Sequence, residues 1–137
     1  MLFRVWARTR EDGLNPLPAM FESVSARFAT PELTAACESY FALTEACLAR
    51  PLEPAPEQSA VLSRDEAALL DMLRQVPSLV TEGPSPAIPH GLPGALQWAA
   101  FAVLRAFASA GEYLLPGPQL PPGKCPFGNE SATRTER

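Results

Sequence analysis

Apolar residues recur at helical spacing along several stretches of the chain, and the most apolar stretch lies toward the C-terminal end. Residues 95–115, ALQWAAFAVLRAFASAGEYLL, carry only Gln97, Arg105 and Ser109 as polar side chains before Gly111. With about 100° of turn per residue, these three fall within one narrow side of a helix, and apolar side chains occupy the rest. The pattern therefore predicts a buried, central helix over residues 95–115 that the other helices cover.

A membrane span is the alternative for this stretch, because a bilayer requires about 20 predominantly apolar residues. Arg105 stands in the middle of the stretch, and a central arginine costs about 2.5–3.5 kcal/mol on insertion scales. Gln97, Ser109 and Glu112 add further polar groups. We therefore expect a core helix and no membrane association.

Four further helices are expected before this one, over residues 2–11, 16–28, 31–49 and 64–75. Gly13 suits the left-handed residue that follows the first helix. The pairs Asn15-Pro16 and Thr30-Pro31 each combine a capping side chain with a proline that has no N–H to leave unpaired.

The last of these four helices has the clearest start. Ser63 and Glu66 form a capping box, in which each side chain bonds to the backbone N–H of the other residue. This role also explains the adjacent carboxylates of Asp65 and Glu66 better than acid–base chemistry does. Arg4 and Arg8, one turn apart in the first helix, are expected to form a solvated basic face.

The 16 prolines gather mainly in residues 51–56, 77–93 and 116–126. Proline and glycine disfavour regular structure, so we expect irregular connections at residues 50–59 and 77–94 and a disordered tail at residues 116–137. Alternation of apolar and polar residues never persists long enough to predict a strand. The expected fold is all-α, a single-domain bundle of about five helices within residues 1–115.

The net charge and the cysteine content limit which classes of function the protein can have. A net charge of −4 supplies no basic face for DNA or RNA. The three cysteines form no disulfide framework, and the first six residues are too short for the apolar region of a signal peptide, so we expect a cytoplasmic protein. Cys37 is expected in the core, and Cys47 in the core or at its boundary. Ten residues apart on a helix, these two thiols point in different directions and cannot chelate one metal ion together.

Two residues could carry ligand chemistry. Cys125 precedes Pro126, as in heme-regulatory motifs where an accessible thiolate binds ferric iron. The alternative is that Cys125 is an exposed cysteine without a ligand. His90, the only histidine, could supply a second ligand to a metal or heme, act as a base, or remain solvated. The sequence contains no nucleophile elbow or phosphate-binding loop, so no enzymatic activity and no metal site is predicted.

Residues 2–74 resemble a family of small bacterial proteins classed as a domain of unknown function. The resemblance rests on the Gly13-Leu14-Asn15 end of the first helix, a Phe-bearing second helix and the Asp65-Glu66-Ala67 start of the capped helix. Where that family carries a run of cysteines before the capped helix, this chain has LEPAPEQSAVLS. The resemblance implies a helical fold over half the chain and no activity.

The near-continuous apolar surface of residues 95–115 favours a protein-interaction or regulatory module that acts by self-association or by binding a protein partner. The alternative hypothesis is a binder of a small hydrophobic ligand or heme. The candidate ligand-binding residues for that alternative are Trp98, Phe101, Phe107, His90 and Cys125.

Overall fold

The computed structural model describes residues 2–24, 30–81, 92–110 and 127. These residues form helices and connecting segments without any strand, which confirms the all-α prediction. The helices are α1 (Leu2–Glu11), α2 (Pro16–Ser23), α3 (Pro31–Leu48), α4 (Arg64–Thr81) and α5 (Leu92–Ser109).

The helix starts are built as their sequence signals predict. The Asn15 side chain accepts a hydrogen bond from the Leu17 N–H at 3.1 Å, and Thr30 caps α3 in the same manner. In the capping box of α4, Ser63 N–H donates to Glu66 Oε2 at 2.8 Å and Glu66 N–H donates to Ser63 Oγ at 3.1 Å. Gly13 adopts a φ of 72°, the left-handed conformation expected after α1.

Four helix boundaries differ from the predictions, and one of them is the end of α5, which lies at Ser109 instead of residue 115. α2 ends at Ser23 instead of residue 28, because Val24 is extended. α4 continues through Pro77 to Thr81, although proline removes one helical hydrogen bond and usually ends or kinks a helix at the preceding residue. α5 begins at Leu92, because Pro93 falls in its first turn, where a missing N–H costs nothing.

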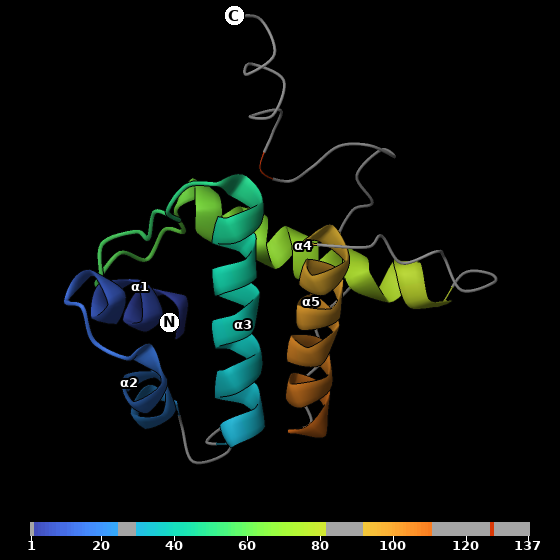
Figure 1. Ribbon diagram of the computed structural model, residues 1–137, viewed down its shortest axis with the longest axis horizontal. Coiled ribbons are helices and arrows are strands. Elements are labelled where there is room, and N and C mark those ends of the chain that lie inside the picture. The colour runs from blue at the N-terminus through green and yellow to red at the C-terminus, as the bar shows by residue number, and fades with distance from the viewer. Residues whose placement is uncertain (1, 25–29, 82–91, 111–126, 128–137) are drawn as a thin grey trace, which may run out of the picture.

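α3 is the centre of the bundle (Figure 1). It stands between α1 and α2 on one side and α5 on the other, while α4 passes across one end of α3 and α5. α3 contributes six buried residues, Leu33, Thr34, Cys37, Tyr40, Phe41 and Thr44. The predicted central helix, α5, instead lies at one side of the bundle, with Trp98 57% exposed to solvent.

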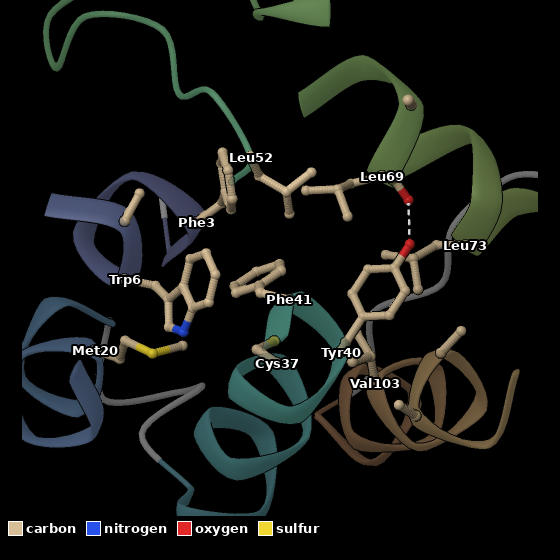
Figure 2. Packing of buried hydrophobic residues seen from close by; sticks show 14 of the residues in the cluster. Phe3, Trp6, Met20, Cys37, Tyr40, Phe41, Leu52, Leu69, Leu73 and Val103 are labelled. Atoms are coloured by element: carbon tan, nitrogen blue, oxygen red, sulfur yellow. Dashed lines mark hydrogen bonds between the residues drawn. The ribbon is translucent and has the colours of Figure 1, made fainter. Parts of the chain in front are cut away.

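Aromatic contacts join α1 to α3 in the middle of this core (Figure 2). The centroid of the Phe41 ring lies 5.2 Å from the centroid of the Phe3 ring and 5.3 Å from that of the Trp6 ring. Phe127 also belongs to the core and is only 2% exposed. The remainder of the predicted tail, residues 116–126 and 128–137, lies outside the described residues.

Candidate functional site

A cavity of about 580 Å³ lies among the helices, in the size range of small-molecule sites. α1, the end of α2, α3, α4, α5 and the segment 59–62 all contribute to its wall. Most of the lining side chains are apolar: Leu2, Phe3, Val24, Leu33, Phe41, Ala60, Leu62, Leu69, Leu70, Leu73, Val103 and Phe107. Leu62 is 49% exposed and therefore marks the rim of the cavity.

One charged pair, Arg4 and Glu66, interrupts the apolar wall. Arg4 Nε donates to Glu66 Oε1 at 2.7 Å, and Arg4 Nη2 donates to Glu66 Oε2 at 3.0 Å. The guanidinium also donates to four backbone carbonyls of the segment that precedes α4, those of Pro56, Glu57, Ser59 and Val61. The expectation that Arg4 belongs to a solvated face is therefore wrong, because the connection folds back over α1. Arg8 remains on the surface and pairs with the exposed Glu57.

Glu66 is held ionised by its surroundings. Burial alone would raise the pKa of Glu66, but hydrogen bonds from Arg4 and from the N–H groups of Ser63 and Ala55 outweigh burial and lower that pKa. Its two carboxylate oxygens together accept four hydrogen bonds. Glu66 therefore fixes the start of α4, as the capping box predicts, and it also fixes the segment before α4.

The neighbouring Asp65 anchors the other end of the same segment. Both Asp65 oxygens accept from the Arg50 guanidinium, at 2.8 and 2.9 Å, and Oδ2 also accepts from the Glu53 N–H. The hydrogen bonds from Arg50 lower the pKa of Asp65 against the opposing effect of burial. Leu52, between these contacts, is only 4% exposed. Residues 50–59 are thus irregular, as predicted, but these hydrogen bonds fix them against the helices and Leu52 is buried.

The remaining polar groups of the cavity are neutral, and their hydroxyl groups are hydrogen-bonded within the protein. The Tyr40 hydroxyl donates to the Leu69 carbonyl at 2.7 Å (Figure 2), and burial raises the pKa of Tyr40. Burial also raises the pKa of the Cys37 thiol to about 12, so this thiol stays protonated at neutral pH. The hydroxyls of Ser23 and Ser59 donate to the carbonyls of Met20 and Val61.

The structure separates the candidate ligand-binding residues from one another. Phe107 lines the cavity. Trp98 and Phe101 lie outside it, on α5, with their rings in an edge-on contact 6.2 Å apart. His90 and Cys125 lie outside the described residues. Cys37 is buried as predicted, whereas Cys47 is exposed and not in the core or at its boundary.

Sequence reasoning did not select Phe3, Arg4 or Tyr40 as parts of a site. Phe3 and Tyr40 were recognisable only as apolar-face residues of their helices. The sequence places Arg4 in one predicted helix and the acidic capping box in another. Nothing in their spacing indicates that Arg4 and Glu66 form an ion pair.

No known protein family, curated protein or solved structure matches this chain. Within the described residues, no three or more His, Cys, Asp or Glu side chains gather so as to hold a metal ion. None of the helices in the same residues has the length and apolar character needed to cross a membrane. The case for a function therefore depends on the geometry of the cavity and of the surface of α5.

Proposed function

We propose that this protein binds a neutral, hydrophobic small molecule in the cavity among its helices. The observation that carries the proposal is a cavity of about 580 Å³ whose lining is mostly apolar, with a protonated thiol and a few polar groups that are already hydrogen-bonded within the protein. Small-molecule sites typically combine this size with a predominantly apolar and aromatic lining. An apolar ligand would gain from leaving water without displacing any existing hydrogen bond.

The electrostatics of the cavity select against charged ligands. Arg4 and Glu66 neutralise each other, and the guanidinium directs its remaining donors to backbone carbonyls. A carboxylate ligand would have to break the Arg4–Glu66 pair, and an ammonium ligand would lose its hydration shell without gaining a free anion. Cys37 stays protonated and therefore does not suit thiolate ligation of heme iron. These features favour an uncharged organic ligand over heme.

A displacement assay on the full chain tests the proposal. The neutral fluorescent probe N-phenyl-1-naphthylamine should bind, and 1-dodecanol should displace it at concentrations at least about 10-fold lower than dodecanoate or dodecylammonium require. Equal displacement by the three compounds would show that the pairing of Arg4 and Glu66 does not select the ligand. Absence of saturable probe binding, with no compound released on solvent extraction of the purified protein, would remove the proposal.

Matched variants locate the binding event. Leu62 lines the rim of the cavity, whereas the adjacent Val61 is 74% exposed and does not line it. Leu62→Trp, and Leu70→Trp deeper in the wall, should weaken probe binding by at least about 10-fold by filling space. Val61→Trp should leave it unchanged. Equal affinities in all three variants, each with a wild-type circular dichroism spectrum, would place the probe outside the cavity.

A further inference from the structure

The exposed side of α5 carries a seven-residue repeat. Ala95, Ala102 and Ser109 are exposed and follow one another at intervals of seven residues, and Trp98 and Arg105, also exposed, stand between them. With about 3.6 residues per turn, these positions form one continuous stripe along the helix. The opposite side of α5 buries Ala99, Ala100 and Val103 in the core. The stripe is therefore a second face, with the spacing that helices use to pack against each other.

Trp98 makes this face unusual for a solvent-exposed surface. Its side chain is 57% exposed and contacts Phe101, and the Arg105 guanidinium lies 5.9 Å from the centre of the Phe101 ring. A cation and two aromatic rings thus lie between small residues that would allow another helix to approach closely. Tryptophan and arginine are the residue types that most often dominate binding interfaces.

We propose that α5 forms the interface of a homodimer, in which two copies pack their α5 helices antiparallel about a two-fold axis at Ala102. This arrangement places Ala102 against Ala102 of the second copy and Ala95 opposite its Ser109. It also places each Trp98 level with residue 106 of the second copy, one position from Arg105, which is within reach of a cation–π contact. The pattern of small, aromatic, small, cationic and small residues therefore complements itself, as the surface of a two-fold dimer must.

The position of the positive charge favours an antiparallel orientation and a second copy of the chain as the binding partner of α5. Arg105 is the only charged residue of α5. In a parallel pair the two Arg105 side chains would face each other and repel, whereas the antiparallel pair separates them and gives each a second aromatic partner besides Phe101. The face has a cation on one side of a small central residue and an aromatic ring on the other. Such a face is complementary to the same face of a second copy, so no other protein is required.

The size of the interface sets the expected strength of the dimer. One pair of 18-residue helices buries less surface than the about 1,600 Å² of a standard interface. The dimer should therefore be reversible and dependent on concentration. Sedimentation velocity on the full chain from about 1 to 500 µM should show a monomer that converts to a dimer. A monomer throughout this range would overturn the proposal.

Substitutions in the stripe separate this dimer from other contacts. Trp98→Ala should abolish dimerisation over the same concentrations. Arg105→Ala should raise the dissociation constant about 5- to 30-fold, because two symmetry-related cation–π contacts are lost. Arg105→Lys, which keeps the charge, should have a smaller effect than Arg105→Ala. A dimer that none of these substitutions weakens would use another surface and would overturn the proposal.

Disulfide cross-linking tests the position of the two-fold axis. Helix axes about 8–10 Å apart, with Cα atoms about 2.3 Å from each axis, bring the two Ala102 Cα atoms within disulfide range. In a Cys47→Ser, Cys125→Ser background, Ala102→Cys should give a covalent dimer under mild oxidation. Gln97→Cys, exposed on the same helix beside the stripe, should give little. Equal cross-linking at both positions, or cross-linking at residue 97 alone, would contradict the proposed axis.

The dimer and the ligand cavity use different residues, so each proposal can fail without the other. Leu62→Trp and Leu70→Trp alter the cavity wall and should leave the sedimentation behaviour unchanged. Trp98→Ala lies outside the cavity and should leave probe binding unchanged. Loss of dimerisation in the cavity variants would show that association depends on the cavity and would overturn the assignment to α5.

Discussion

α3 and α5 are both 18 residues long and rich in apolar side chains, yet they occupy different environments. α3 lies between α1 and α2 on one side and α5 on the other, whereas α5 packs mainly against α3 and α4. α3 therefore buries large side chains such as Leu33, Tyr40 and Phe41, while α5 leaves Trp98 in solvent. The difference shows that the burial of a helix depends on how many neighbours surround it, and that apolar surface left over on α5 is available for association.

The polar residues of α3 and α5 also differ in burial. Thr34 and Thr44 of α3 are buried, and each hydroxyl donates to a carbonyl of the preceding turn, those of Pro31 and Tyr40. Such local bonds satisfy a hydroxyl without water, so α3 accommodates these side chains in the core. The polar side chains of α5, Gln97, Arg105 and Ser109, are all exposed. A helix at the centre of a bundle can thus be less apolar in sequence than a helix at its side.

The largest difference between the two helices should appear on truncation of a buried leucine. Leu33→Ala in α3 should lower the free energy of unfolding by about 2–5 kcal/mol, because it removes buried contacts and leaves a cavity. Leu104→Ala, at a partly buried position of α5, should cost about 1 kcal/mol or less. Urea denaturation measures both. Equal losses would mean that α5 shares the central role of α3 and would contradict the comparison.

Acid should weaken the junction between α3 and α4 before it affects α5. The pKa values of Asp65 and Glu66 are lower in the folded than in the unfolded chain. Their stabilisation is therefore complete above the unfolded pKa values of about 4 and disappears as the pH falls through the lower folded values. The unfolding midpoint should be flat from about pH 7 to 5 and fall below about pH 4. Hydrogen exchange should show the loss of protection first in the first turn of α4.

A matched pair of substitutions on α4 isolates this effect. Asp65→Asn should cost about 1–3 kcal/mol at pH 7, because the charged hydrogen bonds from Arg50 are lost. It should also reduce the slope of stability below pH 4. Asp71→Asn removes a 49% exposed partner of Arg74 and should change stability by less than about 0.5 kcal/mol. If both variants behave alike, Arg50 and Asp65 do not anchor the segment before α4.

Local signals predicted the helices, and tertiary contacts decided what lay between them. The helix starts at Pro16, Pro31 and Arg64 are correct because capping involves residues only two or three apart. The fixed conformation of residues 50–59 was not predictable, because Arg4 bonds to them from more than fifty positions away. Residues 31–49 matched their predicted helix to within one residue, but their central place depends on four neighbouring helices that periodicity does not describe.

The candidate site was less accessible from sequence. Aromatic content identified Trp98, Phe101 and Phe107, but only Phe107 faces the cavity, since Trp98 and Phe101 contact each other on another side of α5. The cavity is formed where every helix contributes a few side chains, and no short motif encodes such a meeting point. The stripe on α5, by contrast, is encoded locally as a repeat. It became recognisable as a face only once the neighbours of α5 were known.

The smallest expected effect on stability, and the sharpest test of the contrast, is Trp98→Ala. Because Trp98 is 57% exposed in the monomer, its truncation should change the free energy of unfolding by less than about 0.5 kcal/mol when measured at a concentration too low for dimerisation. At concentrations where the wild type is dimeric, the wild type should gain a concentration-dependent increase in melting temperature that the variant lacks. A large loss of stability in the dilute variant would mean that Trp98 supports the core, and that the exposed side of α5 is not free for a second copy.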